Sequence, residues 1–191
     1  MKKNIRSESI KSRITDSNPL DTKRFSLRDL CDKDGNEIYL SWMNDVTIRK
    51  FIAASKTIHD LAGLKGYIRE RTNRDSVRFF GIFDKAQKKH IGNIKYEPID
   101  FDMGYAIMGI LIGEPSFRGI GVFSEVYSIS AQYIRSTYNI KKIYLGVNKN
   151  NLAAIKSYEK SGFVVTNDHS LGKHPSGIVM VDLFKSTQWR P

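Results

Sequence analysis

Hydrophobic residues recur along this chain with two different periods, which divide it into strands and helices. Alternating apolar and polar positions predict a strand, and apolar positions three or four residues apart predict a helix. The strands are expected at residues 24–30, 77–83, 90–96, 105–112, 142–147 and 178–184, and the helices at residues 36–44 and 60–72 and from residues 122 and 152 onward. This mixed order of strands and helices indicates an α/β domain.

Local features refine the expected elements. Residues 105–112 are almost all apolar, which is typical of a central strand covered on both faces. The polar residues 84–89 separate the two strands before it, as in a hairpin. Thr57 followed three residues later by Asp60 resembles a capping box, which predicts the start of the helix that ends near residue 72.

The central strand is followed by a loop rich in glycine. The apolar run breaks at Gly113, and the string Arg118-Gly119-Ile120-Gly121 opens the next helix. The first N–H groups of a helix lack partners within the helix and lie at its positive end, so glycines there allow an anion to approach closely. Arg118 adds a forked cationic donor. The loop is therefore predicted to bind phosphate.

Two common phosphate-binding motifs do not fit this loop. A P-loop requires Gly, four residues and then Gly-Lys-Ser/Thr, and the chain has no such string. A dinucleotide fingerprint requires a third glycine, where this chain has Ser124, and an acidic residue further on, where residues 139–142 have none.

The loop resembles motif A of the GNAT superfamily of acetyl-CoA-dependent N-acetyltransferases: Gln or Arg, two free positions, Gly, one free position, then Gly or Ala. With Gly119 and Gly121 at the small positions, Ser116 takes the place of Gln or Arg. Alternatively, residues 115–125 fit the longer family pattern of proline, aromatic, Arg-Gly-x-Gly and helix Glu, with Phe123 where Gly or Ala is usual. We prefer the second alignment, in which Phe123 either narrows the binding cleft or points into the core.

A second segment carries the resemblance further. Residues 147–163 match a later GNAT segment in which an Asn is followed by a small and an aliphatic residue and then by Tyr-Glu-Lys-x-Gly-Phe. The matching positions are Asn151, Ala154, Ile155, Tyr158, Glu159, Lys160, Gly162 and Phe163. Two motifs in the expected order are much more specific than either alone, so the chain is identified as resembling GNAT enzymes over residues 23–184.

The resemblance implies a fold and a coenzyme site. We expect the α/β GNAT fold, a central mixed, mostly antiparallel sheet flanked by helices, in which the strands at 105–112 and 142–147 splay apart and admit the pantetheine arm of acetyl-CoA. Backbone groups near the end of the first strand would pair with the arm, amides of the glycine loop would hold the pyrophosphate, and an Asn would contact the arm from the far side. The coenzyme-binding residues implied are Ile112, Gly113, Arg118, Gly119, Ile120, Gly121, Val122, Phe123 and Asn151.

The resemblance also implies the chemistry. Tyr158 matches the family tyrosine beside the coenzyme sulfur, where a phenol can act as general acid toward the departing thiolate. The general base stays open. The acids that flank the central strand could act through water, or proximity could supply most of the rate. These acids are Glu97, Asp100, Asp102 and Glu114.

Composition adds an anionic partner and a cellular setting. The 191 residues carry a net charge of +11, which favours an anionic partner such as coenzyme A, and we expect no specific nucleic acid. The single cysteine, Cys31, indicates a reducing compartment, and no apolar run suggests a membrane span, so we expect a cytoplasmic protein. Residues 1–21 are predicted to be a flexible basic arm before an acetyltransferase domain at residues 22–191. The four histidines are scattered, and no metal site is expected.

The acceptor is the least determined feature. Residues 90–112 look like GNAT members that acetylate amino sugars for surface polysaccharides, and we favour a small primary amine such as a nucleotide-linked amino sugar. Acetylation of protein N-termini, as in ribosomal-protein acetyltransferases, and a non-catalytic acyl-CoA-binding module are the alternatives. An anionic acceptor and a homodimer are left open. The aromatic residues that could line the acceptor wall are Trp42, Phe51 and Tyr67.

Overall fold

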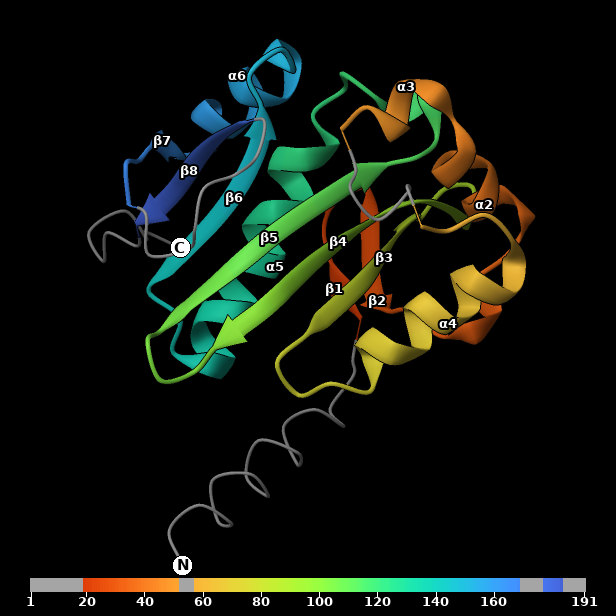
Figure 1. The fold of residues 1–191 in the computed structure, drawn as a ribbon, viewed down its shortest axis with the longest axis horizontal. Helices are drawn as coiled ribbons and strands as arrows, with labels where there is room; N and C mark the ends of the chain where they lie inside the picture. The colour runs from red at the N-terminus through yellow and green to blue at the C-terminus, as the bar shows by residue number, and fades with distance from the viewer. Residues whose placement is uncertain (1–18, 52–56, 169–176, 184–191) are drawn as a thin grey trace, which may run out of the picture.

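One eight-stranded sheet runs through the computed structural model, which describes residues 19–51, 57–168 and 177–183 (Figure 1). The strand order is β1-β2-β3-β4-β5-β6-β8-β7. The strands are β1 (Leu20–Asp21), β2 (Phe25–Asp29), β3 (Arg78–Asp84), β4 (Lys89–Asp100), β5 (Tyr105–Ile112), β6 (Lys142–Asn148), β7 (Val164–Val165) and β8 (Gly177–Leu183). The helices are η1 (Asp32–Asp34), α2 (Glu37–Asn44), α3 (Val46–Arg49), α4 (Leu61–Thr72), η3 (Pro115–Phe117), α5 (Val122–Tyr138) and α6 (Leu152–Lys160).

The centre of the sheet contains its one parallel pair. β5 and β6 run parallel and pair from Tyr105↔Lys142 to Ile107↔Tyr144, whereas every other described pair is antiparallel. Beyond those residues β5 stays paired with β4, and β6 stays paired with β8. The two central strands therefore diverge toward their carboxyl ends. The predicted α/β fold with splayed central strands is confirmed.

Helices cover both faces of the sheet, and each face has its own apolar core. α5 packs on the face formed by Ile94 and Tyr96, where the Tyr96 hydroxyl lies 2.9 Å from Ser130 Oγ. α2 and α4 pack on the opposite face, around Tyr39, Leu64 and Phe79 (Figure 1). Side chains alternate between faces along a strand, so neighbouring positions of β4 and β5 serve different cores.

The starts of the helices follow their capping residues. Asn36 accepts a hydrogen bond from Tyr39 N at 3.0 Å and begins α2, as the apolar pattern predicts. Asp60 accepts one from Gly63 N at 2.7 Å and begins α4. The expected capping box, with Thr57 as the cap, was therefore wrong, because Asp60 itself stands at the cap position.

Several short elements were not predicted. α3 and the two-residue strands β1 and β7 are too short to show a period, and β4 extends beyond the expected residue 96 to Asp100. Most of the predicted arm, residues 1–18, and the end of the last expected strand, residue 184, lie outside the described residues. The arm and its boundary therefore stay predictions. Among the described helices, none is long and apolar enough to cross a membrane.

A half-buried histidine links the two strands of the β3–β4 hairpin to α2. The ring of His90 stacks on Phe83 and meets the edges of Tyr39 and Trp42, and its Nε2 lies 2.8 Å from Gly92 O. Burial lowers the pKa of His90 to about 4, although the charge of Asp34 acts in the opposite direction. Folded His90 is therefore neutral at pH values where an exposed histidine is protonated.

The free energy of unfolding should consequently decrease as the pH is lowered from about 6.5 toward 4. Between the unfolded pKa of about 6.5 and the folded pKa of about 4, the unfolded chain binds the extra proton, so the contribution of neutral His90 is complete above pH 6.5 and is lost as the pH falls. We expect a loss of about 2 kcal/mol between pH 7.5 and pH 5, absent in His90→Gln. Urea unfolding at both pH values measures it. Equal pH dependence in the two proteins would contradict this assignment.

Candidate active site

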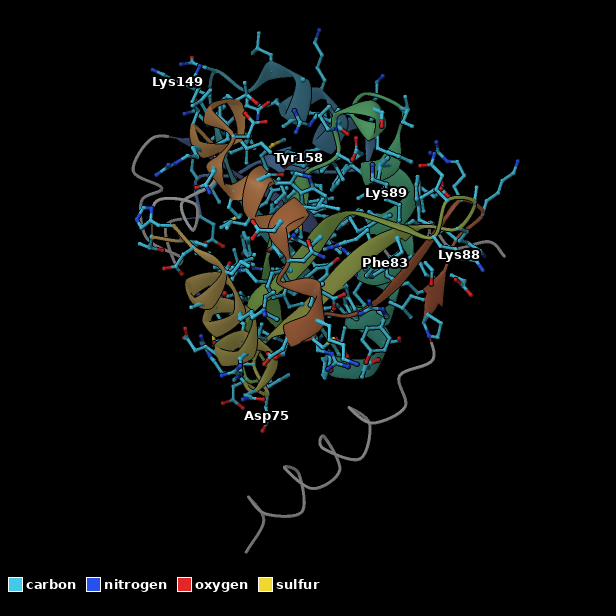
Figure 2. All side chains as sticks on the ribbon, turned by 90° about the vertical axis from the view of Figure 1, so that its right-hand side faces the viewer. Asp75, Phe83, Lys88, Lys89, Lys149 and Tyr158 are labelled. Carbon is cyan, nitrogen blue, oxygen red and sulfur yellow. The ribbon has the colours of Figure 1, made fainter. Side chains whose placement is uncertain are left out.

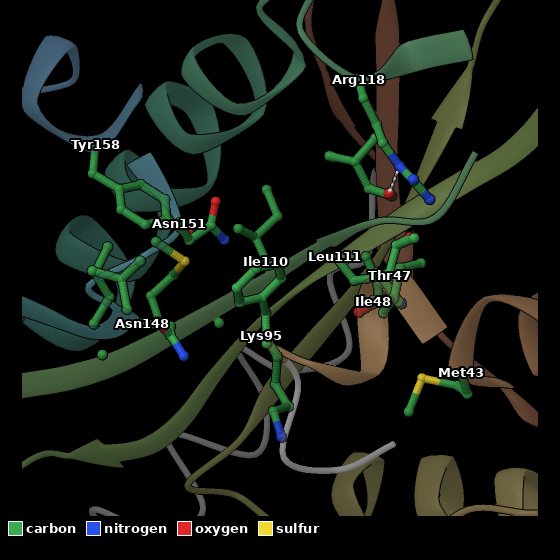
Figure 3. Close-up of a pocket in the computed structure, with 18 of the residues that line it drawn as sticks. Met43, Thr47, Ile48, Lys95, Ile110, Leu111, Arg118, Asn148, Asn151 and Tyr158 are labelled. Atoms are coloured by element: carbon green, nitrogen blue, oxygen red, sulfur yellow. Dashed lines mark hydrogen bonds between the residues drawn. The ribbon is translucent and has the colours of Figure 1, made fainter. Parts of the chain in front are cut away.

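A cavity of about 560 Å³ opens where β5 and β6 diverge. Its walls come from β4, β5, β6 and α6 and from the helices α2, α3 and α4. Tyr158 and Asn151 lie on one side, Met43 and Ile48 on the other, and Lys95 lies between them (Figure 3). Segments far apart in the chain therefore contribute to one site.

The edge of β5 that borders the cavity has unpaired backbone. Met108 to Ile112 line the cavity, and no described strand pairs with this edge beyond Ile107. The N–H and C=O groups of an unpaired strand edge can bond to another extended chain or ligand. This edge is therefore suited to an extended ligand that contains amide groups.

The predicted glycine loop begins α5. Gly119 and Gly121 have φ angles of +77° and +80°, in the region that favours glycine, and no described atom within 4 Å would meet a side chain at Gly119. Gly121 is the N-cap of α5, and no side chain caps its first N–H groups. The loop from Gly119 through Ile120 to Val122 thus presents backbone donors without bulk around the glycines.

Arg118 braces this loop against the strand before it. Its Nε donates to Ile112 O at 3.0 Å, its guanidinium also donates to Gly113 O at 2.6 Å, and Asp45 lies 3.8 Å away. The side chain lines the cavity while it ties the loop to the end of β5 (Figure 3). Arg118 therefore places a positive charge at the cavity wall and also holds the loop against β5. The sequence pattern did not indicate this second role.

Phe123 points into the core. Only 7% of the residue is exposed, its ring stacks on Tyr127 with centroids 5.3 Å apart, and its ring meets Tyr158 edge-on at 4.9 Å. It does not line the cavity. The unusual residue therefore supports the ring of Tyr158 from behind and leaves the cleft unobstructed.

α6 brings Asn151 and Tyr158 to the cavity. Asn151 begins the helix by accepting a hydrogen bond from Ala154 N at 3.2 Å, and both side chains line the cavity. Burial raises the pKa of the Tyr158 hydroxyl to about 12, so the hydroxyl keeps its proton at neutral pH. In Figure 2, Tyr158 lies within the outline of the molecule, whereas Lys149 and Asp75 lie at its margins.

None of the four acids considered as a general base lines the cavity. Glu97 pairs with Lys95 and Arg74, and Glu114 pairs with Lys89 at 2.6 Å. Asp100 ends β4 and Asp102 lies in the turn that follows, where Asp100 accepts hydrogen bonds from Asp102 N and Met103 N. Within the described part of the chain, the cavity wall contains no carboxylate, and no group of acids, histidines and cysteines could hold a metal ion.

Of the three aromatic residues considered for an acceptor wall, two line the cavity, and their contact with an acceptor stays a prediction. Phe51 and Tyr67 line the cavity. Trp42 is buried instead against Gly113, where a Cβ would lie 2.0 Å from the indole. Trp42 therefore fixes the distance between α2 and the end of β5, and only a glycine fits at position 113.

A polar contact between chain-distant residues holds the start of α5, and the sequence analysis missed it. Glu125 accepts hydrogen bonds from Thr22 Oγ1 at 2.7 Å, from Arg24 N at 2.8 Å and from Arg24 Nε at 2.7 Å. Both terminal nitrogens of Arg24 lie 3.1 Å from Ile120 O. Arg24 therefore connects β2 to the glycine loop, and no sequence pattern links positions so far apart.

Loss of this contact should loosen the loop. In Arg24→Gln the Ile120 carbonyl and Glu125 lose their charged partner, and we expect amide hydrogen exchange across residues 118–125 to rise about 10-fold or more. Exchange measured by mass spectrometry reports this directly. Arg69→Gln, which removes an exposed ion pair with Asp32, is the matched control and should leave the loop unchanged. Unaltered exchange in Arg24→Gln would show that the loop is rigid without Arg24.

Comparison with known proteins identifies the family of this chain and several solved structures with a similar fold. Residues 24–164 match the family model of the acetyltransferase (GNAT) domain. Among solved structures, a spermidine N-acetyltransferase from Vibrio cholerae, in complex with CoA and spermine, is 24% identical, with a TM-score of 0.71 over 84% of this chain and 95% of that chain.

Two further structures share the fold at lower identity. A ribosomal L7/L12 alpha-N-protein acetyltransferase in complex with coenzyme A is 13% identical, with a TM-score of 0.73 over 87% of this chain and 98% of that chain. A microcin C7 self-immunity acetyltransferase in complex with acetyl-CoA and AMP is 15% identical, with a TM-score of 0.70 over 85% and 93%. At these identities the likeness establishes the fold alone.

Proposed function

The chain belongs to the GNAT acetyltransferase family, and from that premise we propose that it transfers an acetyl group from acetyl-CoA to a primary amine in the cavity between β5 and β6. The observation that carries this proposal is one cavity bordered by the unpaired edge of β5, by Arg118 beside the glycine loop and by Tyr158. These parts supply, in order, a surface for an extended arm, charge for phosphate and a proton donor.

The residues present fit the coenzyme. The backbone of Met108 to Ile112 would pair with the amides of the pantetheine arm, and the uncapped amides from Gly119 to Phe123 would hold the pyrophosphate. Asn151 would contact the arm from the side of β6. Bound there, acetyl-CoA would supply the thioester that activates the acetyl group for transfer.

The chain's residues then have defined tasks. The amine must arrive neutral, because only the neutral form has a lone pair to attack the carbonyl carbon. As the C–N bond forms and the C–S bond breaks, Tyr158 directs its hydroxyl proton toward the departing sulfur. The proton lost by nitrogen passes to water, since the described cavity residues include no carboxylate base, and Tyr158 regains a proton from water before the next turnover. Positioning of the two reactants supplies much of the rate.

The acceptor we propose is a small primary amine, with a nucleotide-linked amino sugar as the first candidate. The described cavity residues include no carboxylate to pair with additional cationic groups of an acceptor. This supports an acceptor that is neutral or anionic apart from its reactive amine over a polyamine. A thiol-release assay with acetyl-CoA and amino sugars, short peptides and polyamines tests the function. Release with an amine supports transfer. Tight coenzyme binding without release for any acceptor would favour the non-catalytic binding module.

The glycine loop can be tested separately. Gly121→Val adds a β-branched side chain at a φ of +80° where backbone must approach phosphate, and we expect coenzyme A affinity to fall at least 10-fold by calorimetry. Gly104→Val is the control, because its φ of +68° imposes similar strain in the β4–β5 turn. Normal affinity in folded Gly121→Val would exclude the loop as the phosphate site.

Tyr158→Phe should slow the chemical step. The ring would still pack on Phe123, so coenzyme affinity should change little, whereas positioned acid catalysis is typically worth about 10² to 10⁴ in rate. Single-turnover acetyl transfer at saturating coenzyme is the measurement. Tyr133→Phe serves as a control tyrosine outside the cavity. An undiminished rate in Tyr158→Phe would leave that residue a packing role only.

A further inference from the structure

The part of the cavity that faces α4 has a polar floor. Lys95 and Asn93 occupy alternate positions of β4, so both side chains lie on the face covered by α2 and α4, where Tyr67 also reaches the cavity. Lys95 pairs across the sheet with Gly109, at which an added Cβ would meet no atom within 4 Å. Because position 109 has no side chain, the cavity extends from the splayed strands to Lys95.

The polar groups at this floor are hydrogen-bond donors. Lys95 Nζ donates to Tyr67 Oη at 2.9 Å and to Glu97 at 2.5 Å, and its third proton has no acceptor among the described residues. Tyr67 accepts from Lys95, so its own hydroxyl proton remains available. Asn93 is only 6% exposed, and its Nδ2 makes no hydrogen bond of good geometry with any described residue, although the Tyr39 hydroxyl lies close enough to interact with the amide. A buried donor without a partner is costly and indicates that a ligand or water satisfies it.

The charges around Lys95 do not balance. Lys95, Arg71 and Arg74 all pair with Glu97, and the two arginines also pair with Glu70. Three cations therefore share two carboxylates, which leaves one positive charge. Burial alone would raise the pKa of Glu97, but Lys95 and the arginines lower it overall, so Glu97 stays ionised. Of the cluster, Lys95 is the member that lines the cavity, with 21% of its side chain exposed.

We propose that the acceptor carries an anionic oxygen group, a carboxylate or a phosphate, as well as its reactive amine, and that Lys95, Tyr67 and Asn93 bind this group. The proposal rests on acetyl transfer at this cavity and specifies the substrate class. An anionic group would neutralise the excess positive charge of the cluster and would accept a hydrogen bond from each of the three donors. The amine end of the same molecule would then extend past Gly109 toward the splayed strands.

The competing explanation is that Lys95 only stabilises the β4–α4 contact through its ion pair with Glu97. The two explanations differ in selectivity. A purely structural lysine would affect all acceptors equally, whereas an anion-binding lysine would affect anionic acceptors alone. Lys89, which pairs with Glu114 at 2.6 Å outside the cavity, provides a matched control.

The kinetic test uses pairs of acceptors that differ in charge. Glucosamine 6-phosphate is compared with glucosamine, and 4-aminobutyrate with butylamine, for the wild-type protein, Lys95→Met, Lys95→Arg and Lys89→Met. We expect a lower KM for at least one anionic member, and a loss of about 10- to 100-fold in its kcat/KM in Lys95→Met, with the neutral member changed less than about threefold. Lys95→Arg should restore part of the preference, and Lys89→Met should behave as wild type.

Each pair of acceptors tests a different anionic group. Preference confined to glucosamine 6-phosphate assigns a phosphate, and preference confined to 4-aminobutyrate assigns a carboxylate. Equal use of charged and neutral acceptors, or an equal loss for both in Lys95→Met, would overturn the proposal while acetyl transfer itself stands.

Binding separates this proposal from the proposed function. Calorimetry with coenzyme A-saturated protein measures the affinity of glucosamine 6-phosphate and 4-aminobutyrate without turnover. Binding of either anion that weakens about 10-fold or more in Lys95→Met, but not in Lys89→Met, supports the site even if no acceptor releases thiol. Binding of neither anion, or binding that does not depend on Lys95, would overturn it.

Discussion

The functional site depends on the separation of two parallel strands in the middle of the sheet. β5 and β6 pair only from Tyr105 to Ile107 and from Lys142 to Tyr144, yet each remains paired with its other neighbour to its end. Unpaired backbone groups in the interior of a protein are costly unless something satisfies them. The divergence therefore creates, within an otherwise complete sheet, a polar edge that is suited to an extended ligand.

The divergence gives access to both faces of the sheet. Tyr158 approaches from the side of α5 and α6, supported by the buried ring of Phe123. Lys95 and Tyr67 approach from the side of α2 and α4. A donor and an acceptor that enter from opposite faces could meet only at the gap between the strands, because elsewhere the paired strands and the two cores separate the faces.

Several polar contacts hold the glycine loop in place. Arg118 ties it to the carbonyl oxygens of Ile112 and Gly113, and Arg24 ties its Ile120 carbonyl to β2. The glycines leave the loop without side chains where an anion would approach, so its shape must come from neighbouring residues. A preorganised set of backbone donors costs less to order on binding than a loop that must fold around its ligand.

The order of the long elements, the central strand and the glycine loop follow from the amino-acid sequence alone, because apolar periodicity and glycine requirements are local properties that can be read from neighbouring residues. The sequence also placed Tyr158 and Asn151 on a short helix, and these residues do line the cavity. Which side chains meet depends instead on how the elements pack in three dimensions. Arg24 reaches Glu125, Lys95 of β4 meets Tyr67 of α4, and Phe123 packs against Tyr158, through contacts between residues well separated in the chain. Trp42 lies in the apolar core and the candidate acids lie outside the cavity wall, two of them in ion pairs. A sequence pattern does not show whether a given side chain joins an ion pair, a core or a site.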